Sequence, residues 1–246
     1  NFSASVGGNA MNHNYDRIDG SIEGLVIPAV YKLTNGLANP TMNVYDRDYR
    51  VNSLYGLAAV SYQDKIFLDL TARNDWSSTL PADNNSFFYP GAGISFIASD
   101  ALPGIKSDNG LSYLKASVNV TKTGNDPGVY ATNRIFSAPG NFPYGSTAGL
   151  SLSNREPSPN LNPEFTLSKE LGIEFGFFKN RLTGSATVYQ TNTTDQIIPV
   201  NTSYASGAST NLINIGELEN RGLELTFNGT ILRSEDFIWN LGVNYT

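Results

Sequence analysis

Few side chains in the sequence are suited to acid–base or nucleophilic chemistry. Glu170 and Glu174 form the best-placed carboxylate pair, because their spacing puts both on one face of a β-strand. We interpret them as part of a wet, charged strand face. His13 is the single histidine, so a Ser–His–acid triad would have to use it, and nothing nearby marks a nucleophile. The chain has no cysteine, which excludes thiol catalysis and disulfides. We therefore predict no catalytic residue and no enzyme.

Two segments carry the oxygen ligands that calcium prefers, namely residues 45–49 (YDRDY) and residues 123–128 (TGNDPG). Neither has the spacing of a calcium-binding loop. The segment GAGISF at residues 91–96 lacks the glycine spacing of a dinucleotide-binding loop, and its glycines fit a bend in a strand. We therefore expect no metal and no cofactor.

Composition narrows the class of partner. Charged residues make up 15% of the chain, against roughly 25% in typical soluble domains. The net charge of −6 and the pI of about 4.8 argue against nucleic acid, which selects basic surfaces. The sequence has no run of 18 apolar residues that would predict a transmembrane helix.

Period-2 alternation dominates the chain and predicts β-strands. Ile66, Leu68 and Leu70, for example, alternate with Phe67 and Asp69. The alternating runs extend over roughly 9–12 residues, close to the about 9–11 that a tilted membrane-spanning strand needs. The predicted strands are residues 1–7, 53–62, 65–75, 87–98, 112–123, 167–178, 182–192, 220–231 and 237–246.

The connections between these strands are sorted by length. Residues 63–64, 179–181 and 232–236 form tight turns, whereas the predicted connections 8–52, 124–166 and 193–219 are long. Outer-membrane β-barrels have short periplasmic turns and long extracellular loops. The pattern therefore predicts a segment of an antiparallel transmembrane β-barrel with its tight turns in the periplasm.

Aromatic residues gather at both ends of the predicted strands, as at the two interfaces of a bilayer. Asn74 interrupts the outward-facing row that leads to one of them, Trp76. Arg73 and Asp75 have the opposite parity and are candidates for the barrel lumen, either in contact with a ligand or as a pair that braces the wall. We favour the brace. The candidates for a lipid-interface girdle are Trp76, Phe87, Tyr89, Phe177, Phe237 and Trp239.

Four ordered segments resemble the SusC/RagA family of TonB-dependent outer-membrane transporters. They are SLYGLAAVSYQDKIFLDLTARNDWSSTLPADNNSFFYPGAGISF, LSYLKASVNVTKTGND, PNLNPEFTLSKELGIEFGFFKNRLTGSATVYQTNTTDQI and NIGELENRGLELTFNG, and together they cover most of residues 50–246. The second is similar to a family pattern LK-x-R-x-S-x-G-x-TGN. Leu114, Lys115, Ser117 and residues 123–125 match it, whereas Ala116 and Val120 depart from it.

The resemblance implies a plugged barrel of about 22 strands, of which residues 1–246 would supply about nine. The plug domain, the TonB box and the terminal barrel strands would then lie outside this chain. It also implies import of an oligosaccharide or a peptide, a SusD-like lipoprotein lid, TonB acting through the plug, contact with outer-membrane lipid, and a dimer of transporter–lid pairs.

Three other functions are compatible with parts of the pattern. A secreted β-sandwich carbohydrate-binding module would explain the aromatic residues and Asn-rich loops, but not the strand lengths. A β-rich glycoside hydrolase would need two carboxylates about 5–10 Å apart across one cleft. A passive porin would share the barrel but not the dependence on TonB.

Overall fold

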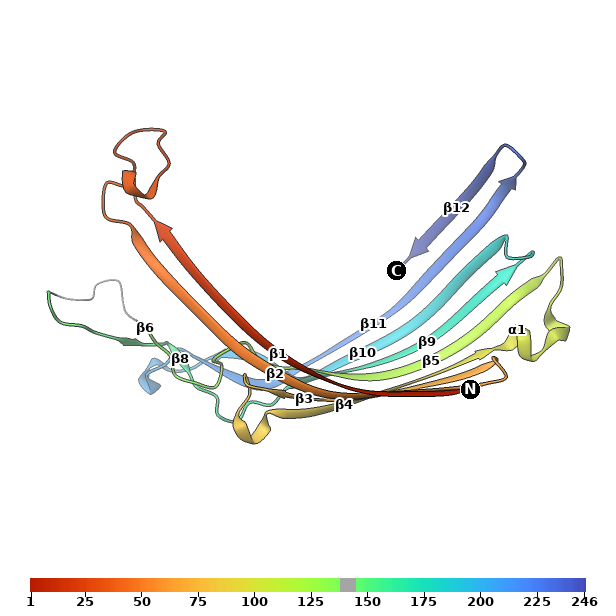
Figure 1. Cartoon of the computed structure of the whole chain (residues 1–246), viewed down its shortest axis with the longest axis horizontal. Coiled ribbons are helices and arrows are strands. Elements are labelled where there is room, and N and C mark those ends of the chain that lie inside the picture. The colour runs from red at the N-terminus through yellow and green to blue at the C-terminus, as the bar shows by residue number, and fades with distance from the viewer. Residues whose placement is uncertain (138–144) are drawn as a thin grey trace.

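The computed structural model describes residues 1–137 and 145–246, which are organised as antiparallel β-strands (Figure 1). Within these residues the main sheet has ten strands, and nine of them follow one another across the sheet in the order of the sequence. They are β1 (Phe2–Ser21), β2 (Thr41–Tyr62), β3 (Ile66–Ser77), β4 (Ser86–Ile97), β5 (Leu111–Asn125), β9 (Glu164–Phe177), β10 (Leu182–Asn201), β11 (Thr210–Arg233) and β12 (Ile238–Tyr245). This confirms the predicted antiparallel barrel segment of about nine strands.

Short elements lie in the connections. The strand β8 (Arg155–Glu156) pairs with β11 in parallel, and β6 (Phe136–Ser137) pairs with β7 (Ser151–Leu152). The helices are η1 (Leu33–Asn35), η2 (Ala82–Asn84), α1 (Ala98–Ala101), η3 (Pro103–Ile105) and η4 (Tyr204–Ser206). None of the helices in residues 1–137 and 145–246 is long and apolar enough to cross a membrane.

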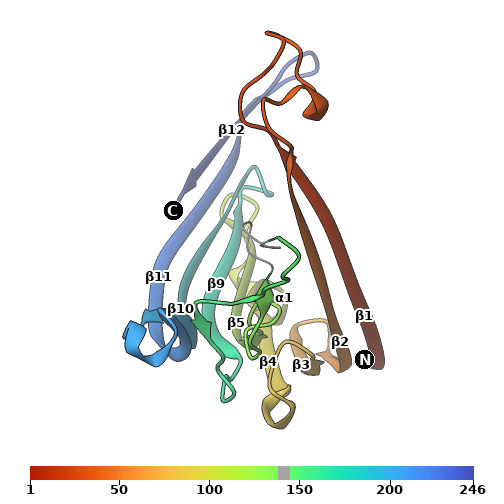
Figure 2. The same ribbon diagram turned by 90° about the vertical axis from the view of Figure 1, so that its left-hand side faces the viewer.

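The sheet is a curved wall that does not close on itself. Figure 2 shows it as a trough, with β1 and β2 along one side and β11 and β12 along the other. The edges of the trough are β1 and β12. A closed barrel has no edges, so this shape is that of a barrel segment.

Four of the strands, namely β1, β2, β10 and β11, are much longer than predicted. The strands β1 and β2 pair without a register break from Phe2↔Val60 to Ser21↔Thr41, so most of residues 8–52 is a strand hairpin. Residues 193–219 likewise belong mostly to β10 and β11. The prediction of long loops there was wrong, because these extensions carry polar residues on both faces and lack the apolar alternation that marks a strand.

The register separates two faces of the sheet, because residues directly opposite each other in an antiparallel pair point to the same side. We call the face that carries Asp69, Arg73 and Asp75 the polar face. Other members of the polar face are Ser53, Tyr89, Asn119, Glu170, Thr187 and Glu224. We call the face of Ile66, Leu68 and Leu70 the apolar face. Other members of the apolar face are Ala58, Ile94, Val118, Leu171, Val188 and Leu223.

The apolar face is not covered by protein. Leu171 and Val188 expose 51% and 54% of their surface, and the buried apolar side chains of the described residues belong to loops or strand ends. A contiguous apolar surface of this kind marks contact with lipid or another protein. In a membrane barrel the apolar face is the outward one and contacts lipid.

Candidate functional site

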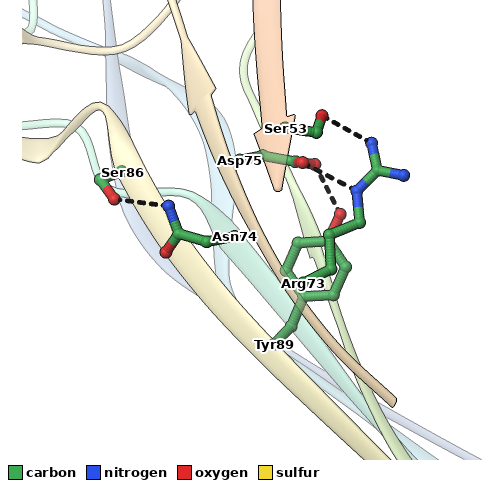
Figure 3. Close-up of polar contacts among 6 residues, drawn as sticks. All are labelled: Ser53, Arg73, Asn74, Asp75, Ser86 and Tyr89. Carbon is green, nitrogen blue, oxygen red and sulfur yellow. Dashed lines mark hydrogen bonds and ion pairs between the residues drawn. The ribbon is translucent and has the colours of Figure 1, made fainter. Parts of the chain in front are cut away.

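The polar face of β3 carries a hydrogen-bonded cluster built around Asp75 (Figure 3). Arg73 Nε donates to Asp75 Oδ1 at 2.8 Å, and Arg73 Nη2 donates to Ser53 Oγ on β2 at 2.9 Å. The two residues point to the same side because they are two positions apart on one strand. The sequence therefore predicted their shared face, but the contact with Ser53 depends on the pairing of β2 with β3.

Tyr89 completes this cluster from β4. Its hydroxyl donates to Asp75 Oδ2 at 2.5 Å, and the register places Tyr89 opposite Arg73 and Phe87 opposite Asp75. The prediction that Phe87 and Tyr89 belong to the lipid-interface girdle with Trp76 was wrong, because the register places both on the polar face. Phe87 is 5% exposed on the polar face.

The correction follows from the hairpin that joins β3 to β4. Trp76 pairs with Ser86, so the next apolar-face residue on β4 is Phe88, which is 54% exposed. The path of the intervening loop decides which of the three aromatic residues lies on the apolar face. Because the three are consecutive, the sequence alone does not show which of them point to that face.

The geometry of Asp75 favours the bracing role. The residue is 6% exposed, and both of its carboxylate oxygens accept hydrogen bonds. The side chain of Arg73 is 39% exposed, so part of the guanidinium faces the open side of the cluster. Ligand contact by this cluster stays a prediction, and it concerns Arg73 more than Asp75.

A second cluster ties the β3–β4 connection to the segment after β5. Ser77 Oγ and Thr79 Oγ1 donate to Asp126 Oδ2 at 2.5 and 2.7 Å. Ser77 and Thr79 are 1% and 5% exposed, so their hydroxyls need these bonds. Asp126 belongs to the segment that the sequence suggested as a source of calcium ligands. The described part of the chain contains no group of three or more His, Asp or Glu side chains that could hold a metal.

A cleft of about 360 Å³ is lined in part by Thr79 and Asp126 of this cluster, and we call it the outer cleft. His13 and Tyr15 of β1 face Tyr49 and Arg47 of β2 across the register, and all four have the parity of the polar face. The His13 and Tyr49 rings lie 5.0 Å apart, centroid to centroid. The remaining lining residues are Thr79, Asp126, Pro127, Gly128 and Val129.

Sequence reasoning missed the outer cleft. It placed His13 in a long loop, whereas His13 lies within β1. The Tyr130 hydroxyl accepts a hydrogen bond from the Asp48 backbone N–H at 3.2 Å. This bond connects the segment after β5, which lines one side of the cleft, to β2. The alternation of residues 13–17 and 45–49 was the available signal, since every second residue there, counted from the first, is aromatic or basic.

Glu174, Asn74 and Trp76 lie on strands. Glu174 on β9 forms an ion pair with Lys115 on β5 at 2.9 Å, in line with a charged strand face. Asn74 donates to Ser86 Oγ at 2.9 Å, which satisfies a polar side chain on the apolar face (Figure 3). Trp76 lies on the same face and is 40% exposed.

Aromatic residues gather near the tight turns. The rings of Phe177 and Phe178 lie 6.3 Å apart, and Phe237 and Trp239 are 58% and 49% exposed. Their role as a lipid-interface girdle stays a prediction. In the β4–β5 turn, a hydrogen bond from Lys106 holds the pKa of the exposed Asp100 carboxyl below its usual value.

Comparison with known protein families gives a match over nearly the whole chain. Residues 3–246 match the family model described as TonB dependent receptor-like, beta-barrel. TonB-dependent receptor P26 of Formosa agariphila is 31% identical over 214 residues, covering 83% of this chain and 21% of the relative. TonB-dependent receptor SusC of Bacteroides thetaiotaomicron is 28% identical over 206 residues, covering 79% of this chain and 20% of the relative.

Solved structures give the same result. The RagAB peptide importer in its closed-closed state superposes with a TM-score of 0.83 at 26% identity, covering 99% of this chain and 27% of the matched chain. The ferric enterobactin receptor PfeA of Pseudomonas aeruginosa superposes with a TM-score of 0.60 at 17% identity, a likeness of fold. The chain thus spans about a fifth of its curated relatives, 21% and 20% in these two cases.

Proposed function

Because the chain belongs to the TonB-dependent receptor-like β-barrel family, we propose that it forms part of the wall and extracellular loops of a transporter that imports nutrients across the outer membrane. In this proposal residues 1–246 all belong to one barrel domain, and the plug, the TonB box and the remaining strands are supplied from outside these residues. The chain performs no covalent chemistry.

The observation that carries the proposal is the two-faced sheet. Its apolar face is exposed across β3, β4, β5, β9, β10 and β11, while its polar face carries hydrogen-bonded and charged side chains. A secreted β-sandwich would bury such an apolar face against a second sheet. This argues for the barrel and against the carbohydrate-binding module.

The named relatives support a finer version of the proposal. One is SusC, and the RagAB structure is that of a peptide importer. We propose that a SusD-like lipoprotein caps the extracellular mouth, that the substrate is an oligosaccharide or a peptide, and that TonB acts on the plug. Two transporter–lid pairs would form a dimer.

The outer cleft is the proposed place of substrate contact on this chain. It presents aromatic rings, the Arg47 guanidinium and the Asp126 carboxylate on the polar face, beyond the buried Asp75 cluster. Rings that stack and charged groups that donate or accept hydrogen bonds suit both sugars and peptides. The lining of the cleft is therefore compatible with both substrate classes.

Uptake of labelled oligosaccharides and peptides by whole cells tests the proposal. We expect uptake to be lost in cells without TonB function, whereas undiminished uptake would identify a passive porin. Arg47→Ala should lower uptake by roughly tenfold, the effect of losing about 1.4 kcal/mol of binding free energy.

Arg50→Ala is the matched control for Arg47→Ala. Arg50 lies on the same strand but pairs with Asn12, so its side chain has the opposite parity. Equal effects of the two substitutions would remove the outer cleft from the proposal. Recovery of the native protein in aqueous buffer without detergent would contradict the barrel as a whole.

A further inference from the structure

The apolar face ends in basic side chains on the side away from the tight turns. Along β5 the face runs through Val118 and Val120 to Lys122, and along β11 it runs from Leu223 to Arg221. On β9 the residue after Leu171 on this face is Lys169. We call Lys122, Lys169 and Arg221 the basic row.

The register makes these residues neighbours. Lys169 pairs with Val120 on one side and with Gln190 on the other, and Gln190 pairs with Arg221. Lys122 pairs with Leu167 and is therefore diagonal to Lys169. Adjacent strands are about 4.8 Å apart, so Lys169 and Arg221 are separated by roughly 10 Å at the backbone. Side chains of this length can reach one headgroup between them.

Among the described ion pairs, one involves a member of the basic row. The Lys122 ammonium lies 3.5 Å from the centroid of the Phe165 ring, and Arg221 pairs with Glu219. Within the described residues, Lys169 is exposed and has no ion pair. By contrast, Lys106 and Lys179 at the tight-turn end pair with Asp100 and Asp108 at 2.5 and 3.2 Å.

The same face is hollowed beside the row. A shallow hollow of about 710 Å³ is lined mainly by apolar-face residues of β5, β9, β10 and β11. Its lining includes Val118, Val120, Leu171 and Val188 together with Lys169 and Arg221. An apolar floor with two cations at one rim matches an amphipathic molecule whose charged end is negative.

We propose that the basic row binds the phosphate groups of an outer-leaflet lipid, whose acyl chains lie in the hollow. A cation at the edge of an apolar surface needs a counter-charge, because an unpaired charge next to hydrocarbon is costly. A phosphate supplies that charge and accepts hydrogen bonds from both lysine and arginine. The inference rests on the proposed function and on the orientation predicted from the loop lengths, in which the tight turns are periplasmic.

Lipid retention tests the proposal. The protein is extracted from the outer membrane in mild detergent, and co-purifying lipid is counted by native mass spectrometry before and after titration with lipid A. We expect the variant Lys122→Gln/Lys169→Gln/Arg221→Gln to retain at least threefold less lipid A. The matched control is Lys106→Gln/Lys115→Gln/Lys179→Gln, which removes three lysines from the turns and the polar face, and it should retain the normal amount.

Dephosphorylated lipid A and inorganic pyrophosphate separate the contribution of the phosphate groups from that of the acyl chains. We expect dephosphorylated lipid A to bind weakly to the unsubstituted protein, and pyrophosphate to compete poorly because it lacks acyl chains. Unchanged retention of lipid A by the basic-row variant would overturn the proposal, as would equal binding of the dephosphorylated lipid.

Two further measurements distinguish a variant that does not fold from a wrong proposal, and a wrong lipid site from a wrong transport function. If the triple variant does not insert into the membrane, the single variants are used. Lys169→Gln should halve the retention of lipid A, and Lys169→Arg should restore it. Unchanged retention in Lys169→Gln would contradict the site. Uptake is measured in parallel. Normal lipid retention with no TonB-dependent uptake would contradict the transport proposal and leave the lipid site in place.

Discussion

At the scale of single residues, Asp75 is a buried side chain of the polar face whose two carboxylate oxygens both accept hydrogen bonds. It accepts hydrogen bonds from Arg73 and Tyr89, which come from β3 and β4, while Arg73 also bonds Ser53 on β2. The Arg73–Asp75 pair therefore connects three strands. Sequence parity identified the pair Arg73–Asp75, and the tertiary structure added Tyr89 and Ser53.

Asp75→Ala should destabilise the barrel by about 1–3 kcal/mol, because it leaves the half-buried Arg73 guanidinium and the Tyr89 hydroxyl without their acceptor. The free energy of unfolding is measured by urea titration in lipid vesicles, followed by tryptophan fluorescence. Asp75→Asn, which keeps an acceptor, should cost less.

Asp69→Ala is the control for this prediction. Asp69 lies on the same strand and the same face, but it is exposed and makes no ion pair in the described part of the chain. Its effect should stay within about 0.5 kcal/mol. A loss as large as that of Asp75→Ala would mean that the cluster contributes no specific stability.

At the scale of elements, strand register decides which residues meet. Gly184 on β10 shows how closely the strands approach, since a Cβ at this position would lie 2.6 Å from the Thr226 carbonyl oxygen and 2.7 Å from the Phe175 ring. A backbone atom cannot move aside without breaking the pairing of β10 with β11. Glycine here is a requirement of the sheet.

Gly184→Ala should therefore destabilise the barrel by about 1–3 kcal/mol, the usual cost of overpacking. Gly229→Ala is the control, because on the same face its new Cβ would meet its nearest atoms at 3.7 Å, an ordinary contact. The same urea titration measures both. Equal stability of the two variants would show that β10 and β11 can separate at little cost.

At the scale of the whole molecule, the turns are staggered along the sheet. One row of paired residues runs from Ile66 through Phe96, Ala116, Ile173 and Ala186 to Leu225. Ile66 begins β3 beside its tight turn, whereas Leu225 lies well inside β11. A stagger of this kind tilts the strands relative to the axis of a barrel.

The orientation of the whole wall in the bilayer is tested by two neighbouring residues of β3. Leu68→Arg places a charge on the apolar face and should destabilise the barrel by about 2–4 kcal/mol if that face meets the middle of the bilayer. Asp69→Arg changes the polar face and should be far milder. The fraction of folded protein after urea titration in vesicles measures both, and equal effects would contradict the assignment of the faces.

The sequence by itself determined the number and order of the long strands, their two-faced character and the family. Alternation with period 2 is a local property, because the pleat sends successive side chains to opposite faces. The parity of Arg73, Asp75 and Trp76 could therefore be read directly. The four family segments are likewise contiguous in sequence and needed no tertiary information.

Only the tertiary structure decided how those strands are paired. The loop between β3 and β4 sets the register that puts Phe87 and Tyr89 on the polar face and Phe88 beside Trp76. The outer cleft and the basic row join residues from strands far apart in the sequence. Such contacts depend on loop paths and cross-strand pairing, and no periodicity within a single strand encodes them.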